Sequence, residues 1–407
     1  MKLSQFKLEN FRPKPHCQLR LAPRLNVFLG ENGSGKTSLL DGIAIGLGEI
    51  LTHLPKVTGI TFRQQGDIHQ KNNTLAPYAR ITLETIQGLT WDRQQKRDKS
   101  QKTTRLIPPA LGVKNLRTFL DETVIQPLND GQPFTLPVFA YYGVSRALLD
   151  IPLRRRGFPA DYHRFDALAN ALDANTRFRS AFAWFYHKEN EEHRRQKAER
   201  SFDITLSELD AVRRAITRLF PDLTDPHIEV NPLRFVLRQG QETLNIAQLS
   251  DGYQTLLGLV IDLSARMAMA NPHLPDPLAA EAVVMIDEVD LHLHPAWQER
   301  VLGDLLSIFP QTQFIVTTHS PFIVESVNNH LKRQQIAGLP IVDDTIRTLL
   351  PLSATDIAAY LIMAEDEQTL MDAESGLLDD RLLVRFNAIN QLYDQMRDIE
   401  WAAKSLG

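Results

Sequence analysis

Short apolar runs and longer helical patterns alternate along the chain. Residues 25–29, 283–286 and 314–316 are short and mainly apolar, as expected for strands buried inside a sheet. A helical pattern follows the first of these runs, and another separates the second from the third. Because parallel strands need a crossover connection, which is usually a helix, this alternation predicts an α/β protein with a parallel sheet.

Other segments predict further helices. Leucine, valine and isoleucine recur at helical spacing in residues 206–220. Residues 178–201 start aromatic and become densely charged, with acids and bases three to four positions apart, which is typical of a solvated helix. From Asp356 to Asp380 the chain has eight acidic residues and no basic residue. We expect this end of the chain to be helical and either to dock a separate protein or to cover the sheet.

Composition narrows the class of protein. The 407 residues are 43% hydrophobic and 23% charged, as in ordinary globular proteins, and can form two or three structural units. With a formal net charge of −4, binding to nucleic acid would need a local basic surface. The single cysteine, Cys17, excludes internal disulfides and cysteine-based zinc sites. The sequence shows no signal peptide and no apolar stretch of membrane-spanning length, so we expect a cytoplasmic protein.

A glycine-rich sequence follows the first predicted strand. In "GENGSGKTSLL", Gly30, Gly35, Lys36 and Thr37 match G-x-x-x-x-G-K-[ST], with a strand before and a helix after. The glycines let backbone N–H groups surround phosphates, and the helix directs its positive end toward them. Lys36 can reach the β- and γ-phosphates, and the Thr37 hydroxyl can bind Mg²⁺. The motif predicts a nucleoside triphosphate site.

Chemically active side chains also follow the other two strands. Asp287 and Glu288 end the second strand, where one carboxylate can hold the water shell of a metal and the next can orient or deprotonate a water. His319 follows the third strand, in "TTHS". A histidine after a strand is more often structural than catalytic. One crossover helix separates His319 from Glu288, however, which places both at the same edge of the sheet.

The start of the helix after residue 249 offers a second anion site. Ser250, Asp251 and Gly252 precede an apolar run, and the oxygens of serine or aspartate can simply cap such a helix. The chain already has one phosphate loop, so a second anion site is most useful if it completes the site of another subunit. Basic runs at 91–105 and 154–156 are candidates for sequence-independent contacts with nucleic-acid phosphates, although solvated loops explain them equally well.

The order of these motifs resembles the ABC-type ATPase heads of the branch that contains SMC, RecF and OLD-like proteins. The resemblance covers about 1–150 and 230–325, and includes "LSDGYQTLL" and "DEVDLHLHPAWQ". Within that branch the chain is most similar to small bacterial ATPases of the Septu (PtuA-like) type and to their retron-associated relatives. This similarity implies an α/β, two-lobed P-loop ATPase head with a helical insertion and a helical C-terminal tail.

The resemblance implies four segments. They are an ATPase lobe with the P-loop (1–150), a mostly helical insertion (151–228), an ATPase lobe with the signature helix, the strand carboxylates and the switch histidine (229–350), and a helical tail (351–407).

The resemblance also implies roles for single residues. ATP phosphates and Mg²⁺ would be bound by Gly30, Glu31, Asn32, Gly33, Ser34, Gly35, Lys36, Thr37 and Ser38. Asp287 would hold Mg²⁺ together with Thr37, Glu288 would be the catalytic base, and His319 would sense the γ-phosphate. The ATP of the opposite subunit would be contacted by Ser250, Asp251 and Gly252. A glutamine would contact the metal and the attacking water, and Gln65, with Gln64 as the alternative, is our candidate.

Arg146 and the pair His292 and His294 each leave two interpretations open. Arg146, in a turn after the predicted strand that begins near residue 138, either touches phosphate or braces the loop. The spacing of His292 and His294 suits a metal pair, but no cysteine or third histidine stands near them. We therefore favour a loop that faces the other subunit.

The function implied by the resemblance is that of an ATP-binding and hydrolysing switch. It would work as a homodimer through composite ATP sites, with a higher oligomer as a further option. It would control or recruit a separate nuclease, such as an HNH protein, in bacterial anti-phage defence, with DNA or RNA as a further partner and no membrane. The alternatives are a RecF-like ATPase of DNA repair without a nuclease partner and an ABC transporter motor. The long separation of Lys36 from Ser250 argues against the transporter motor.

Overall fold

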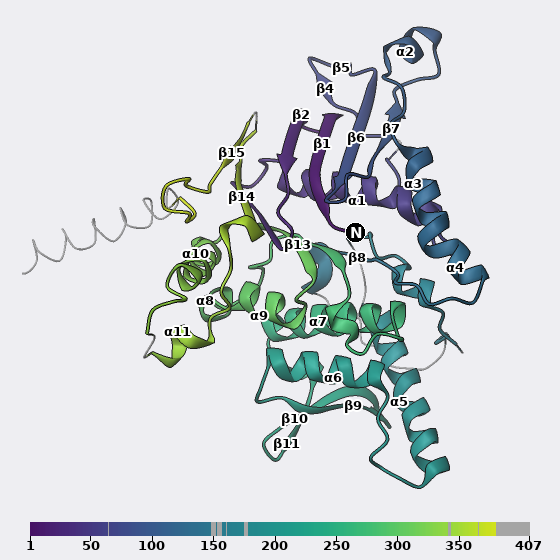
Figure 1. Cartoon of the computed structure of the whole chain (residues 1–407), viewed down its shortest axis with the longest axis vertical. Helices are drawn as coiled ribbons and strands as arrows, with labels where there is room; N and C mark the ends of the chain where they lie inside the picture. Colours follow the sequence, from purple (N-terminus) through teal and green to yellow (C-terminus); the bar gives the residue numbers. More distant parts are fainter. Residues whose placement is uncertain are drawn as a thin grey trace, which may run out of the picture.

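The computed structural model describes residues 1–63, 65–147, 152, 157–159, 161–174, 178–340, 343–364 and 366–379. A six-stranded sheet lies at its centre (Figure 1). Its strands are, in spatial order, β15 (Glu367–Thr369), β14 (Ile357–Ile362), β3 (Leu25–Leu29), β13 (Thr312–Thr318), β12 (Ala282–Ile286) and β8 (Val138–Tyr142). All neighbouring strands pair in parallel except β14 and β15. The α/β fold predicted from the alternating pattern is confirmed.

The strand register aligns the ends of the three strands that carry the predicted site. Thr318 of β13 pairs with Leu29 of β3, and Val316 pairs with Ile286 of β12. Every residue of β3, β8, β12 and β13 is buried. These strands are therefore covered on both faces, as their apolar runs predict, and the residues that follow them emerge at one edge of the sheet.

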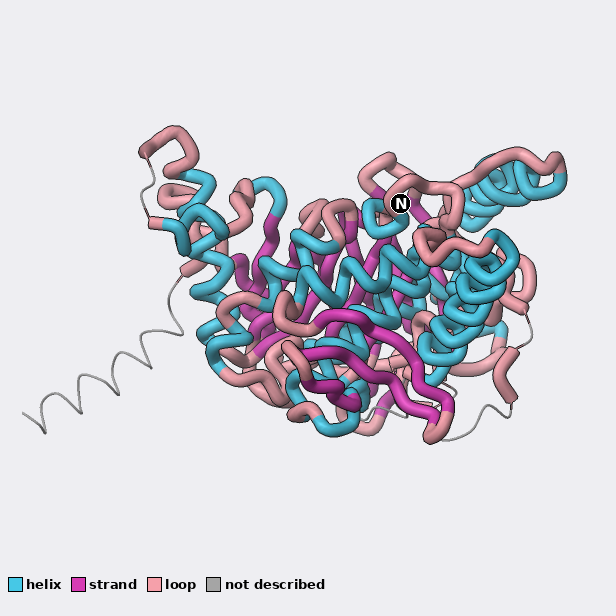
Figure 2. Tube along the Cα trace, turned by 90° about the horizontal axis from the view of Figure 1, so that it is seen from below, coloured by secondary structure: helices cyan, strands magenta, loops and turns pink. Residues whose placement is uncertain are grey.

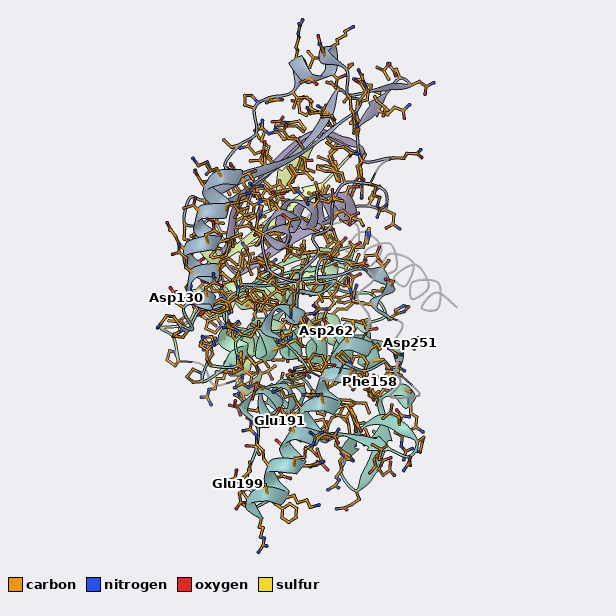
Figure 3. All side chains as sticks on the ribbon, turned by 90° about the vertical axis from the view of Figure 1, so that its right-hand side faces the viewer. Asp130, Phe158, Glu191, Glu199, Asp251 and Asp262 are labelled. Atoms are coloured by element: carbon orange, nitrogen blue, oxygen red, sulfur yellow. The ribbon has the colours of Figure 1, made fainter. Side chains whose placement is uncertain are left out.

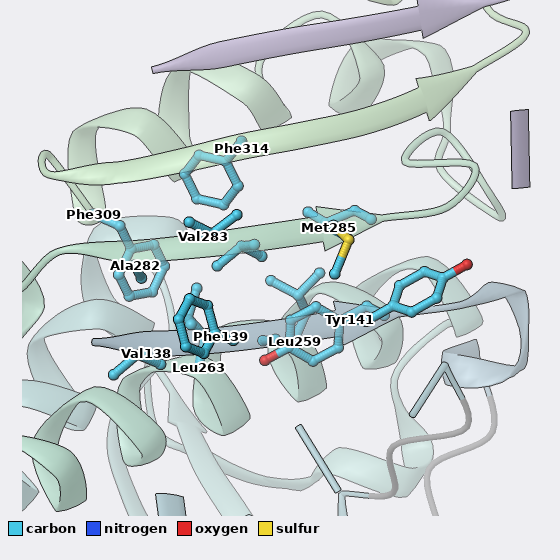
Figure 4. Close-up of a cluster of buried hydrophobic side chains, with 14 of the residues drawn as sticks. Val138, Phe139, Tyr141, Leu259, Leu263, Ala282, Val283, Met285, Phe309 and Phe314 are labelled. Atoms are coloured by element: carbon cyan, nitrogen blue, oxygen red, sulfur yellow. The ribbon is translucent and has the colours of Figure 1, made fainter. Parts of the chain in front are cut away.

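Helix α7 (Asp251–Ala270) packs against this sheet. Figure 4 shows Leu259 and Leu263 of α7 beside Val138 and Phe139 of β8, with Met285 of β12 close to them. All five side chains are almost completely buried. Burial of a side chain of this size stabilises the fold by about 1.5–3 kcal/mol. This packing ties α7, including its first turn, to the central sheet.

A second sheet, antiparallel, lies on the other side of helix α1 (Lys36–Thr52). Its strand order is β2 (Lys14–Arg20), β1 (Leu3–Phe11), β6 (Tyr78–Thr85), β7 (Thr90–Lys96). Glycine is needed where α1 crosses this sheet, because a Cβ on Gly46 would lie 2.6 Å from Leu83 Cδ1. The outer tip of this part is made by β4 (Gln70–Lys71), β5 (Thr74–Leu75) and α2 (Gln101–Leu106), from which α3 (Val113–Leu120) and α4 (Gln126–Asn129) lead back to β8 (Figure 1).

Helices and a small sheet form the opposite end of the molecule. They are α5 (Arg179–Glu199), α6 (Ser207–Leu219), β9 (Thr224–Val230), β10 (Leu233–Gln239) and β11 (Glu242–Asn245). The sheet forms an outer layer over α6 (Figure 2), which in turn packs on α7. The prediction of a solvated helix over 178–201 is only partly right, because Glu189 and Glu192 are 4% and 2% exposed. Their carboxylates accept hydrogen bonds from the N–H groups of Ile228 and Leu206, respectively.

The prediction of a helical tail from residue 351 is wrong over β14 and β15, which are strands. β14 adds to the central sheet beside β3, and β15 returns antiparallel to β14. A bare β3 edge would leave its backbone N–H and C=O groups unpaired, and a strand satisfies them where a helix cannot. Residues 380–407 of the expected tail, and the basic run at 154–156, lie outside the described residues.

The remaining helices complete the cover of the sheet. They are α8 (Pro295–Gln298), α9 (Val301–Ile308), α10 (Pro321–Gln335) and α11 (Asp344–Thr348). α8 and α9 together form the crossover between β12 and β13 that the sequence predicts. Within the described part of the chain, no helix has the length and apolar character that crossing a membrane requires.

Candidate active site

The P-loop, residues 30–37, connects β3 to α1 as an open cradle. Gly33 and Gly35 have φ angles of 82° and 98°, in the left-handed region that favours glycine. Helix α1 begins at Lys36, and no side chain caps its first N–H groups. Among the described residues, the buried hydroxyl of Ser34 has no hydrogen-bond partner either. These unpaired donors are what a phosphate group would satisfy.

The side chain of Lys36 folds back onto the start of the P-loop. Its Nζ donates hydrogen bonds to the carbonyls of Gly30, at 2.9 Å, and Glu31, at 3.0 Å. Burial lowers the pKa of Lys36, while the nearby carboxylates of Asp287 and Glu288 act in the opposite direction. A cation held only by backbone carbonyls and facing carboxylates is well placed for a new anionic partner, because a charged partner gives a stronger bond than a neutral carbonyl.

Asp287, at the end of β12, links the P-loop to the neighbouring strand. Its two carboxylate oxygens accept hydrogen bonds from the hydroxyls of Thr37, at 2.8 Å, and Thr317, at 2.6 Å. The Asp287 residue is only 2% exposed. A carboxylate and a hydroxyl that converge in this way are the oxygen ligands that Mg²⁺ prefers, with phosphate oxygens and water completing its shell. The residues present therefore fit a Mg²⁺–nucleotide complex.

Glu288 stands in an unusual backbone conformation. Its φ is 48°, a left-handed value that costs a non-glycine residue about 1–3 kcal/mol. The backbone is held there because Glu288 N–H donates to Thr317 Oγ1 at 2.7 Å. The side chain is about one-third exposed, and its Oε1 lies 3.9 Å from His319 Nε2. The turn thus directs the Glu288 carboxylate toward the predicted switch histidine, which follows β13.

Arg146 braces this turn from behind. It is 8% exposed, and its guanidinium donates to the carbonyls of Gly143, Asp287 and Glu288. Burial lowers the pKa of Arg146 to about 10, so the side chain stays charged at neutral pH. Arg146 was expected either to touch phosphate or to brace the loop, and in this structure it braces the loop.

The start of α7 is open to solvent. Ser250 occupies the N-cap position but makes no side-chain cap hydrogen bond, and both Ser250 and Asp251 are exposed. Figure 3 shows Asp251 at the surface of the molecule. Position 252 requires glycine for a packing reason, because a Cβ there would lie 2.7 Å from the carbonyl oxygen of His292. The helix start therefore rests on the loop after Glu288 and leaves its own N–H groups uncapped by Ser250.

The loop that contains His292 and His294 is structural in this geometry. His294 Nδ1 accepts a hydrogen bond from Ala296 N–H at 3.3 Å and so caps α8. Across the described residues, no group of three or more histidine, cysteine, aspartate or glutamate side chains could hold a metal ion. Among the described residues, the structure therefore offers no third ligand for a metal bound by His292 and His294.

Gln65 is exposed and lies in a different hollow. With Arg12, Ile68 and Gln95, among others, it lines a cavity of about 420 Å³ that contains none of the P-loop residues. Gln65 and the P-loop residues therefore do not line this cavity together, and the contact of Gln65 with metal and water stays a prediction. Gln64, the alternative, lies outside the described residues.

Two threonines of the site escaped the sequence prediction. Thr317 orders both Asp287 and Glu288, and Thr318 Oγ1 donates to the carboxylate of Asp290. A signal was present, because both residues are polar and yet end a buried apolar strand. Polar residues at that place in a parallel sheet are candidates for the site, since ligands bind outside the carboxyl ends of the strands.

The fold and the site together define a P-loop ATPase. Residues 115–325 match the family described as "AAA domain, putative AbiEii toxin, Type IV TA system", and residues 1–76 match the family "AAA ATPase domain". The chain belongs to this AAA-domain ATPase family. The prediction of an ATPase related to the SMC, RecF, Septu and retron proteins is confirmed.

Curated relatives include retron and Septu proteins. The "Retron Vc95 probable ATPase" of Vibrio cholerae is 25% identical over 86% of this chain and 76% of that protein. The Septu protein PtuA of Bacillus mycoides is 32% identical over 37% of this chain and 19% of its own length. Among solved structures, an SMC head bound to the C-winged helix domain of ScpA has a TM-score of 0.47 at 12% identity, covering 92% of this chain and 99% of that one.

Proposed function

We propose that this chain is a Mg²⁺-dependent ATPase that works as a homodimeric switch in bacterial anti-phage defence. Thr37 and Asp287 would hold Mg²⁺, which when bound neutralises charge on the phosphates. Lys36 would exchange its bonds to the carbonyls of Gly30 and Glu31 for bonds to phosphate oxygens. The unpaired Ser34 hydroxyl and the N–H groups at the start of α1 support this placement of the phosphates.

Glu288 is proposed as the base that orients and deprotonates the attacking water. Its one-third-exposed carboxylate is free to accept a proton, unlike that of Asp287, which is engaged by two hydroxyls. His319, 3.9 Å from Glu288, would contact the γ-phosphate and so report whether it is present. General-base catalysis of this kind contributes typically about 10²–10⁴-fold to a rate.

A dimer with composite sites rests on one observation, the open start of α7. A long helix with an exposed and uncapped N-terminus attracts anions, because its first N–H groups and its dipole both point outward. Ser250 and Asp251 are exposed, so a second copy can approach them. We propose that this α7 start closes on the ATP in the P-loop of the partner subunit.

The relatives support the proposed defence role. The similarity to a retron ATPase runs along most of the chain. The described residues contain no cluster of three acidic or histidine side chains for a metal-dependent nuclease, so a separate protein, such as an HNH nuclease, would do the cutting. We place the switch in the bacterial cytoplasm. Copurification of the native protein with the products of its neighbouring genes tests for that nuclease, and a nuclease-free neighbourhood of repair genes would favour the RecF-like alternative.

Mixing two inactive variants tests the composite sites. Lys36→Ala removes the phosphate-binding amine, and Ser250→Arg places a bulky cation at the start of α7 with the P-loop intact. Each variant alone should hydrolyse ATP at less than about 1% of the native rate, because every closed site would lack one half. Mixed one to one, heterodimers contain one site with both halves intact, and we expect activity to return to about one quarter of the native rate.

The expected fraction follows from random pairing, in which half of the dimers are mixed and each of these has one of two sites intact. ATP binding to Ser250→Arg, measured with a fluorescent ATP analogue, should stay within about threefold of native. A mixture that recovers no activity, although both variants fold and Ser250→Arg binds ATP, would contradict the composite site.

A further inference from the structure

A cavity of about 540 Å³ lies beside the P-loop. Residues 29–34 and His319 form one side of it. The other side is formed by the end of β14 and the residues that follow it, and the apolar side chains there belong to Leu361, Ile362, Met363, Ala364 and Leu370. Cavities of this size accommodate small organic ligands. The apolar side has no part in the phosphate chemistry described above.

The position of β14 in the sheet indicates which part of a nucleotide would lie in this cavity. β14 pairs with β3 on the side away from β13 and β12. Asp287 and Glu288, which mark the γ-phosphate end of the site, follow β12. A nucleoside triphosphate that lies along the P-loop with its γ-phosphate toward these carboxylates directs its nucleoside toward β14. Ligands of open α/β sheets bind in this crevice outside the strand ends.

We infer that residues 361–364 form the wall against which the nucleobase of the bound triphosphate packs. This inference rests on the proposed ATPase function and adds the residues that recognise the base. The faces of a nucleobase are flat and weakly polar, and they gain from contact with apolar side chains as they leave water. Met363 suits such a contact because its flexible, polarisable side chain makes favourable contacts with aromatic rings.

The wall is held rigidly against the P-loop. A Cβ on Gly30 would lie 2.4 Å from the carbonyl oxygen of Ile362, so the loop and β14 touch backbone to backbone. Lys14 of β2, only 1% exposed, donates to the Met363 carbonyl and lies 2.7 Å from Glu367 Oε1. The same lysine side chain reaches the last glycine of the loop, since a Cβ on Gly35 would lie 3.4 Å from its Cε. Lys14 thus positions the wall relative to the phosphates.

Comparing ATP with tripolyphosphate tests the wall, because tripolyphosphate has the phosphates without the base. Met363→Ala should weaken the binding of ATP about fivefold, through loss of apolar contact, while tripolyphosphate binding changes by less than about twofold. Met371→Ala is the matched control. This residue is also half-buried and close in sequence, but it lines another cavity, with Glu325 and Asn328. It should bind both ligands as the native protein does.

Dissociation constants from isothermal titration with Mg²⁺ present give the comparison, and thermal unfolding shows whether the variants fold. Equal weakening of ATP and tripolyphosphate by Met363→Ala, or no weakening of either, would overturn the base wall and leave the ATPase proposal standing. If the native protein binds neither ligand, the ATPase proposal itself fails. If Met363→Ala does not fold, Ala364→Arg, at an exposed position of the same wall, replaces it with the same two ligands.

Discussion

Glu288, just after β12, has a strained backbone that its neighbours hold in place. Glu288 has a φ of 48°, and a residue stays in that region only when its surroundings over-determine it. Two neighbours supply the support, Thr317 through the Glu288 N–H and Arg146 through the Glu288 carbonyl. Their contacts act on the backbone and leave the carboxylate free. The strain therefore serves to direct this one side chain away from the sheet and toward His319.

The proposed role of Glu288 as the catalytic base predicts that binding and hydrolysis of ATP can be separated. Glu288→Gln keeps the shape and the bracing of the turn but removes the proton acceptor, so ATP hydrolysis should fall by at least about 10²-fold. ATP affinity should change by less than about threefold, and a dimer should accumulate with ATP because it no longer turns over. Phosphate release and size-exclusion chromatography with ATP measure the two effects. Glu299→Gln, an exposed glutamate nearby, is the control. Hydrolysis by Glu288→Gln at the native rate would show that another group is the base.

At the scale of elements, the sequence predicts what is local and misses what depends on a distant partner. β3, β12 and β13 are mainly apolar and are followed directly by Gly30, Asp287 and His319, so their existence and their chemistry are both visible in short windows. β14 is not visible in this way, because acidic residues follow it and its partner β3 lies far away in the sequence. The wall of the nucleotide cavity escaped prediction for the same reason.

Helix α5 also contains a charged residue whose environment depends on a distant part of the chain, which the local sequence does not show. Its pattern of acids and bases is that of a solvated helix, and Glu191 does pair with Lys188 and Arg195 near the surface. Glu189 has no such partner in the helical pattern. Its carboxylate turns inward and accepts from Ile228 N–H of β9 at 3.1 Å. A window on the sequence cannot show that β9 covers this position.

The burial of Glu189 predicts a pH dependence of stability. Burial raises the pKa of Glu189 from 4.5 to about 7, against the opposing effects of Ile228 N–H, Arg213 and His227. A raised folded-state pKa means that the stability contribution is full below pH 4.5 and is lost as pH rises through about 7. The loss amounts to about 3 kcal/mol at most.

Glu189→Gln should remove this loss. The glutamine is neutral at every pH and keeps an oxygen for Ile228 N–H, so the variant should be more stable than the native protein at pH 8 and similar to it at pH 5. Urea unfolding between pH 5 and pH 8 gives the comparison. Glu191→Gln is the control, because salt bridges lower the pKa of Glu191 despite its partial burial and its removal should not stabilise the protein at pH 8. Equal pH slopes for native protein and Glu189→Gln would disprove the assignment.

At the scale of the whole molecule, the nucleotide site occupies the middle and a basic surface occupies one end. The outer tip of the antiparallel sheet, near α2, carries four exposed cations, Lys96, Lys99, Lys102 and Arg105 (Figure 1). Among the described residues, no ion pair joins these four to an acid, since Asp98 is engaged by Arg97, Ser100 and Thr103. Arg93, from the same basic run, is different: it is ion-paired with Glu49 and donates to the backbone carbonyl of Ile45.

This basic tip is our candidate for contact with DNA or RNA, and salt dependence tests it. Each phosphate contact that is lost lowers the slope of log affinity against log salt by about 0.9 for duplex DNA and about 0.7 for single strands. Replacing Lys99 and Lys102 together by glutamate should weaken binding to oligonucleotides of random sequence at least tenfold and flatten the slope by about 1.4–1.8. The matched control replaces two exposed lysines elsewhere, Lys197 and Lys332, which alters the net charge equally. Equal weakening by both pairs would show that only net charge matters, and it would rule out the tip as a nucleic-acid surface. Loss of binding confined to the Lys99 and Lys102 variant would place nucleic acid at the outer end of the antiparallel sheet that packs on α1, the P-loop helix.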